Sequence, residues 1–172
     1  MKFFVWMKKI RPQQIEENLF LGSGKNVLEE AEITLVCSEK IYKNYFKKHK
    51  HEVYIDSAGV MFSKNKDKIF FSLKDKPLSK SININLTKKI INYIDISVNK
   101  EKKITYIHCK YGVNRSVSHV FMYMIAKKKI NKNSFKEALK EFKEKFYKYA
   151  YPIFGWKTML KKYYPYIDFL NK

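Results

Sequence analysis

Residues 104–126 read ITYIHCKYGVNRSVSHVFMYMIA, and this stretch decides the fold. It opens with a short run dominated by apolar residues, which is typical of a buried β-strand. Between this strand and the second half lies a polar loop with one glycine. A strand, a tight loop and a helix in this order form an anion site, because the N–H groups at the start of the helix point towards the loop. The second half has apolar side chains at helical spacing, at Val117, Val120, Phe121, Met124 and Ile125.

Cys109 and Arg115 stand at the two ends of the loop, with five residues between them. That spacing lets the loop curl until its backbone N–H groups converge on one centre, which makes a nest for a phosphate group. Gly112 lies in the middle, where the curl demands backbone angles that other residues rarely adopt. The sequence therefore predicts that one loop binds a phosphoryl group, through Lys110, Tyr111, Gly112, Val113, Asn114 and Arg115.

The same loop predicts a nucleophile. The start of the helix, the converging N–H groups and the Arg115 guanidinium all favour a thiolate at Cys109, so its pKa should be lowered. A thiolate is the form of cysteine that attacks phosphorus. Ser116 can donate its hydroxyl to the sulfur when the sulfur leaves. The alternative is that Cys109 is only a small buried side chain, the usual role of a lone cysteine, but this would not explain the glycine, arginine and serine that follow it.

The arginine at position 115 is informative because the chain otherwise uses lysine. Of 36 basic residues, only Arg11 and Arg115 are arginine. A planar guanidinium can donate two parallel hydrogen bonds to the oxygens of a phosphoryl group, which an ammonium group cannot. Arg115 is therefore predicted to hold the phosphate.

Outside this stretch, short runs rich in Ile, Val and Phe alternate with helical patterns through the first two thirds of the chain. After residue 107 the apolar period is helical throughout. The prediction is a single α/β domain, in which a central, mostly parallel sheet of about four to five strands is flanked by helices and followed by a C-terminal helical cluster. Strands are expected at 19–21, 33–37, 53–55, 69–73 and 104–107, and helices around 41–46, 86–94, 117–125, 135–146 and 156–163.

The pattern His-Cys-x-x-Gly-x-x-Arg-Ser at 108–116 resembles the signature of the protein tyrosine phosphatase superfamily, and the short chain resembles its dual-specificity branch. Three further segments look like parts of that branch: 15–23, 134–139 and 155–160. The resemblance implies a catalytic domain over residues 15–172, preceded by an N-terminal extension, 1–14, that could form a dimer contact. The loop looks especially similar to the poxvirus-encoded members, which would place the protein in the host cytoplasm or the virion.

The resemblance also implies an aspartic acid on a separate loop, which protonates the leaving oxygen and later activates water. Asp75 is the preferred candidate because it follows the strand-like run 69–73 and precedes Cys109 by a spacing close to that of the family. Asp56 also ends a predicted strand and stays open as the rival. The two remaining aspartates before the cysteine lie in a polar run and on a helix surface, and are Asp67 and Asp95.

A member of this family is a cysteine-dependent, metal-independent phosphatase without a cofactor. The implied substrates are proteins that carry phosphotyrosine and phosphoserine or phosphothreonine. Two other substrate classes stay open, because Lys110 is similar to a basic loop residue of phosphoinositide phosphatases and because RNA 5′-triphosphatases share the loop. A catalytically weak phosphate-binding module is the remaining alternative.

The formal net charge of +20 would suit RNA or anionic lipid. The chain is also crowded with Lys, Ile, Asn, Phe and Tyr, as expected from an AT-rich genome, so these partners are not favoured. Cys37 lies far from Cys109 and is expected to pack within its strand, and neither a metal site nor a disulfide framework is expected. The apolar run at 3–7 is too short for a signal peptide or a membrane helix, which predicts a cytoplasmic protein.

Overall fold

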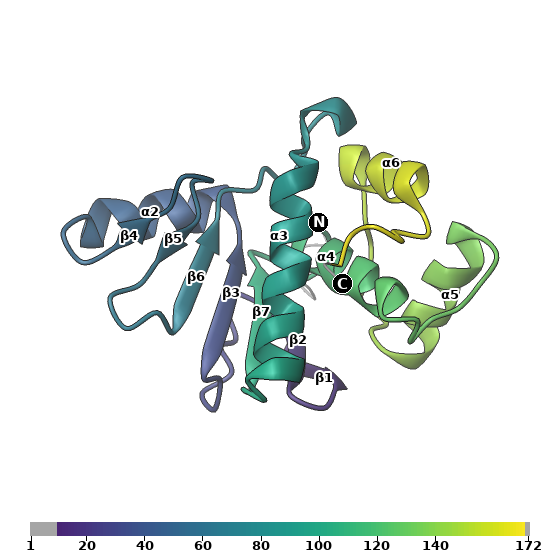
Figure 1. Ribbon diagram of the computed structural model, residues 1–172, viewed down its shortest axis with the longest axis horizontal. Helices are drawn as coiled ribbons and strands as arrows, with labels where there is room; N and C mark the ends of the chain where they lie inside the picture. The colour runs from purple at the N-terminus through teal and green to yellow at the C-terminus, as the bar shows by residue number, and fades with distance from the viewer. Residues whose placement is uncertain (1–9, 171–172) are drawn as a thin grey trace.

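A seven-stranded mixed sheet runs through the molecule, with the strand order β1-β2-β7-β3-β6-β5-β4 (Figure 1). The computed structural model describes residues 10–170. Short antiparallel strands extend both edges: β1 (Gln13–Glu16) pairs with β2, and β5 (Met61–Phe62) links β6 to β4 (Tyr54–Ile55). The four central strands pair in parallel and are β2 (Leu19–Ser23), β7 (Thr105–Cys109), β3 (Ile33–Cys37) and β6 (Lys68–Phe71).

Three helices, α2 (Glu39–His49), α3 (Ile84–Asp95) and α5 (Phe135–Lys145), begin where the sequence supplies a side-chain cap. Ser38 accepts a hydrogen bond from Ile41 N at the start of α2, Asn83 caps α3 in the same way, and Ser134 caps α5. The α3 helix continues directly into a π-helical turn, η3 (Ile96–Lys100). Further helices are α4 (Arg115–Ala126) and α6 (Phe154–Tyr163), and a short 3-10 turn, η2 (Ser79–Ser81), precedes α3.

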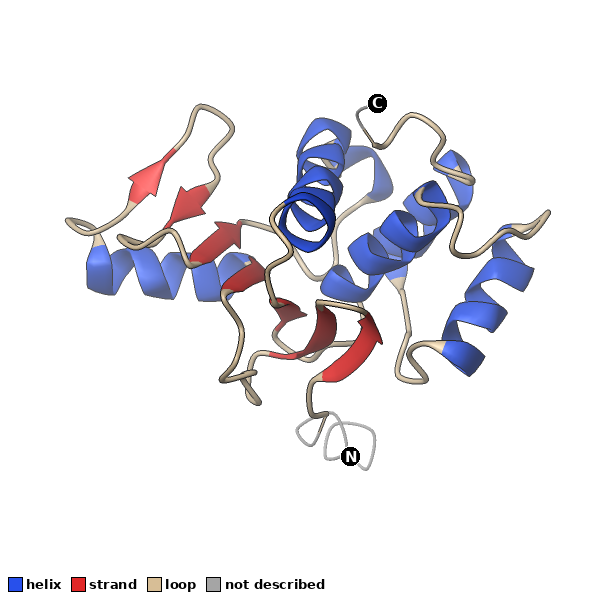
Figure 2. Cartoon of the chain, turned by 60° about the horizontal axis from the view of Figure 1, so that its bottom comes forward, coloured by secondary structure: helices blue, strands red, loops and turns tan. Residues whose placement is uncertain are grey.

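The side chains of each strand alternate between the two faces of the sheet. The helices cover these two faces unequally. Val36 and Phe70 point to one face, where α2 covers a small apolar cluster. Leu35, Cys37 and the alternate residues of the other strands point to the opposite face, into the main core. Figures 1 and 2 show α3 to α6 gathered away from α2, with α5 and α6 on the far side of α4.

The α4 helix is buried on every side, from Arg115 to Ile125. The sequence predicted only a stripe of apolar residues on this helix. The polar residues that complete it, including Ser118 and His119, find partners inside the protein: Ser118 Oγ donates to Asn114 O, and His119 Nδ1 lies 2.7 Å from Arg115 O. A helix enclosed by the sheet and other helices is a rigid base for the loop at its start.

The predicted fold class is confirmed, with corrections in detail. The sheet has more strands than the four to five expected, because β1 and β5 are too short to give an apolar pattern. The expected extension 1–14 overlaps β1, and Ile10 is buried in the core, so the ordered fold begins before residue 15. The rest of that extension, residues 1–9, lies outside the described residues.

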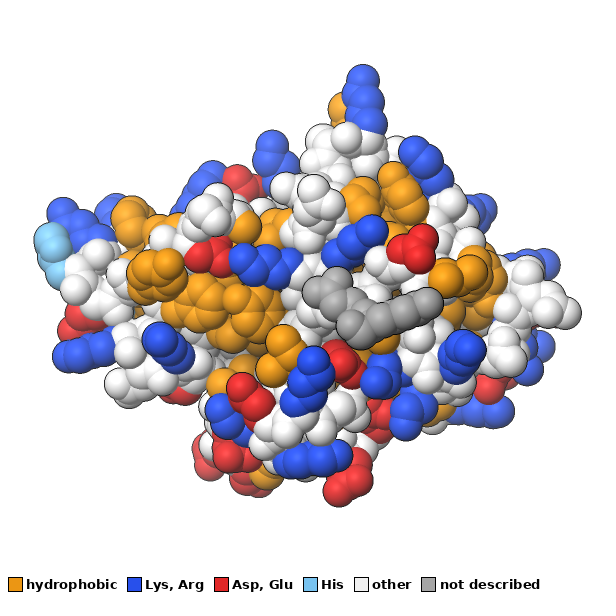
Figure 3. Space-filling model, viewed as in Figure 1, with side chains coloured by type: hydrophobic (Ala, Val, Ile, Leu, Met, Phe, Trp, Pro, Cys, Tyr) orange, Lys and Arg blue, Asp and Glu red, His pale blue; other side chains and the backbone are white. Residues whose placement is uncertain are grey.

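The exposed apolar side chains are unevenly distributed. Tyr54 and Ile55 of β4 are exposed, and Figure 3 shows apolar surface gathered over the β4–β5 region. Lysines are scattered widely over the same view. Within residues 10–170 no helix combines the length and the apolar character needed to cross a membrane.

Candidate active site

Cys109 is the last residue of β7, and α4 begins at Arg115, so the loop between them joins the centre of the sheet to the buried helix. The sulfur is almost fully enclosed, and the cysteine is 1% exposed. Gly112 N donates to Cys109 Sγ at 3.3 Å. The loop therefore curls back over its own first residue, as its spacing predicted.

Gly112 is required at its position for two reasons. Its φ of +71° belongs to a region that other residues rarely adopt. A Cβ built on it would also lie 2.5 Å from Gly22 O, because the loop packs against the end of β2. Tyr147 fixes the same residue from outside by donating its hydroxyl to Gly112 O at 2.7 Å.

The two cysteines of the chain are both buried, yet their pKa values shift in opposite directions. Burial raises the pKa of Cys37 well above its usual value. Burial acts in the same sense on Cys109, but Arg115, the hydroxyl and N–H of Ser116 and the N–H of Gly112 outweigh it, and the pKa of Cys109 is lowered. Ser116 Oγ is itself buried without a well-formed hydrogen bond among the described residues, so its proton is available to the sulfur. Of the two cysteines, Cys109 is thus the one whose surroundings favour the thiolate over the thiol.

Arg115 is 4% exposed and is held from the side of β3 and β6. Its Nη1 donates to Ser38 Oγ at 3.3 Å and to Leu73 O at 3.2 Å. Its Nε lies 3.1 Å from Asp75 Oδ1, in an ion pair without the alignment of a hydrogen bond. None of its contacts within the described chain engages Nη2, which leaves donors for a bound anion.

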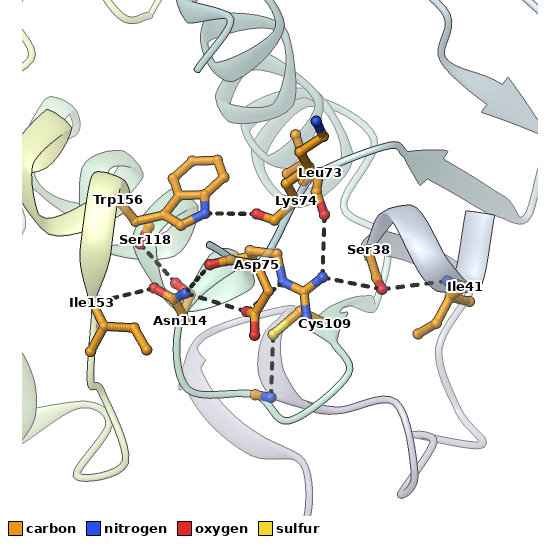
Figure 4. Close-up of polar contacts among 12 residues, drawn as sticks. Ser38, Ile41, Leu73, Lys74, Asp75, Cys109, Asn114, Ser118, Ile153 and Trp156 are labelled. Carbon is orange, nitrogen blue, oxygen red and sulfur yellow. Dashed lines mark hydrogen bonds and ion pairs between the residues drawn. The ribbon is translucent and has the colours of Figure 1, made fainter. Parts of the chain in front are cut away.

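Asp75 lies beside the loop and is held by Asn114 (Figure 4). Asn114 Nδ2 donates to Asp75 O at 2.9 Å and to Asp75 Oδ1 at 3.3 Å. The Asp75 side chain is 37% exposed whereas that of Arg115 is 4% exposed, so the carboxylate stands at the mouth of the site above a buried cation.

The start of α6 fixes the Asp75 loop, residues 74–79, from the other side. Trp156 Nε1 donates to Lys74 O at 3.0 Å, and Asn114 Oδ1 accepts a hydrogen bond from Ile153 N at 3.1 Å. A Cβ on Gly155 would lie 2.2 Å from Pro77 O, so only glycine allows this close approach. Asn114 therefore connects three segments: the loop from Cys109 to Arg115, called the phosphate loop below, the Asp75 loop and the residues that lead into α6.

The rival aspartate lies elsewhere. Asp56 follows β4, which is separated from β7 by β5, β6 and β3. Its carboxylate accepts hydrogen bonds from Ala58 N and Val60 N and is paired with Lys89. Although burial favours the neutral acid, these partners outweigh it and lower the pKa of Asp56. The remaining two aspartates also have structural partners, since Asp67 accepts from Ser63 Oγ and Asp95 pairs with Lys127.

The loop residues predicted to bind phosphate are together, but their side chains differ in orientation. Val113 is buried in the core, and Asn114 is 2% exposed and engaged with Asp75, so both can offer a ligand only their backbone. Lys110 Nζ lies 4.7 Å from the centre of the Tyr111 ring, in a cation–π contact. The groups that this loop can offer to an anion are therefore its backbone N–H groups and Arg115, with the half-buried Lys110 and Tyr111 beside them.

Sequence reasoning missed the residues that support the site from a distance. Ser38 and the Leu73 carbonyl anchor Arg115, and Trp156 anchors the Asp75 loop. Ser38 carries a helix-capping signal in the sequence, but nothing there shows its contact with Arg115. Among residues 10–170 no group of three or more His, Cys, Asp or Glu could hold a metal ion.

No protein-family model and no curated protein matches the sequence. The solved structures that are similar share its fold, which is that of the dual-specificity and tyrosine phosphatases. The human tyrosine phosphatase-like serine/threonine/tyrosine-interacting protein is 17% identical, with a TM-score of 0.61 over 89% of this chain and 95% of that one. The PTP-2 phosphatase of Cydia pomonella is 17% identical, with a TM-score of 0.61 over 92% and 94%. A mouse putative dual specificity phosphatase, solved with zinc tungstate, is 16% identical, with a TM-score of 0.60 over 94% and 92%.

Proposed function

We propose that this protein hydrolyses phosphate monoesters on phosphotyrosine and on phosphoserine or phosphothreonine of proteins, through a cysteinyl-phosphate on Cys109. The observation that carries the proposal is the geometry of the loop, in which Gly112 N donates to Cys109 Sγ at 3.3 Å and the buried Arg115 guanidinium and Ser116 favour the thiolate. Asp75 at the mouth of the same site supplies the acid that the reaction needs. The similarity in fold to several solved phosphatases supports the same proposal.

In the first step the Cys109 thiolate attacks phosphorus, so that a P–S bond forms while the bond from phosphorus to the leaving oxygen breaks. Asp75, as the carboxylic acid, donates its proton to that oxygen. The N–H groups of the loop and the Arg115 guanidinium stabilise the charge on the equatorial oxygens. The substrate leaves as an alcohol or phenol.

In the second step water releases the phosphate. The Asp75 carboxylate takes a proton from the water molecule. The oxygen of that water bonds to phosphorus while the P–S bond breaks. The Ser116 hydroxyl donates to the departing sulfur, which favours the thiolate over the thiol. Inorganic phosphate then leaves, and Asp75 is again protonated.

The substrate class is tested with a panel of phosphopeptides, phosphoinositides and 5′-triphosphorylated RNA. We expect the highest kcat/KM on phosphopeptides, because a single basic residue lies between the nucleophile and the arginine and its ammonium group lies over Tyr111. A higher kcat/KM on a phosphoinositide or on RNA would reject proteins as the substrate class. Binding of phosphopeptides without hydrolysis of any substrate would instead favour the phosphate-binding module.

Asp75→Asn is expected to lower kcat by roughly 10²–10⁴ on alkyl phosphates, because the leaving alkoxide is then not protonated. The loss should be much smaller with a nitro-substituted aryl phosphate, whose leaving group departs as a stabilised anion. Comparing kcat on the two substrates checks the role, since damage to the fold would reduce both to a similar extent.

Asp56→Asn is the matched control. Asp56 pairs with Lys89 and lies after β4, at the edge of the sheet. The change should therefore leave kcat on both substrates, and the ratio between them, as in the wild type. The assignment of the acid is wrong if Asp56→Asn loses far more activity on alkyl phosphates than on the nitro-substituted aryl phosphate while Asp75→Asn behaves as the wild type.

A further inference from the structure

Residues of α5 and α6 line a groove. Figure 1 shows both helices on the side of the molecule away from α2. The volume of the groove is about 630 Å³. Two half-buried apolar side chains, Phe135 and Leu139, form its apolar part. We call it the lysine-lined groove, because its remaining lining residues are Lys136, Lys140, Lys143, Lys157, Lys161 and Glu144.

The charge of the lysine-lined groove is largely unneutralised. Glu144 is the single acidic residue that lines it, and its carboxylate lies 3.9 Å from Lys140 Nζ, at the limit of an ion pair. The other four lysines make no ion pair within the described part of the chain. Five ammonium groups around one hollow repel each other, and an anionic ligand would relieve that repulsion.

The neighbouring side of α5, which shares Lys140 and Glu144 with the groove, shows that this arrangement is not a simple result of a lysine-rich composition. There Glu141 pairs with Lys132 at 3.1 Å and with Lys145 at 2.8 Å, so lysines alternate with carboxylates. Composition alone would place lysines on both sides of the helix alike. Instead, Glu141 on that neighbouring side is paired with two lysines, whereas four lysines of the groove lie beside apolar side chains without an ion pair among the described residues.

We propose that the lysine-lined groove binds an acidic segment of the phosphoprotein substrate, one that carries Asp or Glu together with a large apolar side chain. This deepens the proposed function and rests on it. The apolar side chain would cover Phe135 and Leu139, and the carboxylates would meet the lysines. RNA and an anionic membrane are the other anionic occupants, and the probes below distinguish them from an acidic segment of protein.

The α6 helix connects the groove to the active site. Ile153, just before α6, donates its N–H to Asn114 in the phosphate loop, and Lys157 and Lys161 line the groove one and two turns further along the helix. A substrate held in the groove by one segment would therefore keep its phosphorylated residue near Cys109. Such tethering raises the effective concentration of the reacting group and lowers KM without changing the chemistry.

The binding test uses the full chain and a fluorescent, unphosphorylated peptide of alternating Glu and Leu blocks. We expect binding that weakens with salt, because exposed charges are screened. The double change Lys136→Glu/Lys157→Glu, with one substitution on each helix, should weaken binding by about tenfold or more. Its matched control is Lys47→Glu/Lys48→Glu on α2, which makes the same change of net charge on exposed lysines far from the groove. An equal loss in both variants would overturn the proposal.

Two further probes test the partner class. A peptide with Ser in place of Leu should bind at least about tenfold more weakly, and equal binding would show that the apolar side chains are unused. If 5′-phosphorylated single-stranded RNA or phosphatidylserine vesicles bind more tightly than the peptide, and Lys136→Glu/Lys157→Glu abolishes that binding, the acidic segment is the wrong occupant.

The kinetic test separates this proposal from the proposed function. On a phosphopeptide extended by the Glu and Leu segment, Lys136→Glu/Lys157→Glu should raise KM by about tenfold and leave kcat unchanged. Turnover of a small aryl phosphate should be unaffected, because that substrate cannot reach the groove. If the wild type fails to hydrolyse the aryl phosphate, the proposed function is wrong whatever the peptide binding shows. An unchanged KM on the extended peptide would overturn the groove alone.

Discussion

Cys109→Ser is expected to reduce hydrolysis of an aryl phosphate to background while binding of inorganic phosphate is retained. A serine hydroxyl stays protonated at neutral pH and is a poor nucleophile, so no covalent intermediate forms. The N–H groups of the loop and Arg115 do not depend on the sulfur and should still hold the anion. Hydrolysis assays and calorimetric titration with inorganic phosphate measure the two properties separately.

Cys37→Ser is the control that the chain itself offers. Cys37 is as buried as Cys109 and ends the neighbouring strand, but its pKa is raised rather than lowered. Its replacement should leave kcat within about a factor of two or three, given that it does not touch the reacting atoms. Appreciable turnover by Cys109→Ser, or a loss in Cys37→Ser as large as in Cys109→Ser, would reject covalent catalysis by Cys109.

Arg115→Lys is expected to lower kcat by roughly 10³–10⁵, the range over which arginines that contact a transferring phosphoryl group contribute. The positive charge is kept, but the planar arrangement of donors is lost, and with it the paired hydrogen bonds to the phosphoryl oxygens. Lysine also cannot reproduce the anchoring of Nη1 by Ser38 and Leu73. Steady-state kinetics, with a melting curve to confirm folding, measures the effect.

The exposed Arg11 allows the same substitution as a control, and Arg11→Lys should behave as wild type. Arg115→Met adds a pH test. Without the guanidinium, burial should raise the pKa of Cys109, so the activity that remains should appear only at higher pH than in the wild type. Near-normal kcat in Arg115→Lys would show that Arg115 acts only as a local charge.

The core of the site could be predicted because it is local in sequence. Cys109, Gly112 and Arg115 lie within one loop, and the geometry of that loop follows from spacing and residue type. The strand at 33–37 was predicted with the bounds that the structure has, because five consecutive buried residues give a clear apolar run.

The supports of the site could not be predicted because they depend on tertiary contacts. Ser38 and Leu73 are far from Arg115 in sequence and meet it only because β3, β6 and β7 lie side by side. The choice between Asp75 and Asp56 likewise depends on strand order, since both follow strand-like runs. Because β4 lies at the edge of the sheet, with β3, β6 and β5 between it and β7, the strand order favours Asp75 for the proposed role.

The central claim is that the phosphoryl group is bound covalently to Cys109 during turnover. Trapping this cysteinyl-phosphate tests the claim most directly. The wild-type protein is mixed with an aryl phosphate, quenched with acid during turnover, digested and examined by mass spectrometry. The account predicts a phosphate on the sulfur of Cys109, in a peptide that is unmodified without substrate. Turnover with an unmodified Cys109, or with the phosphate on another residue, would contradict it.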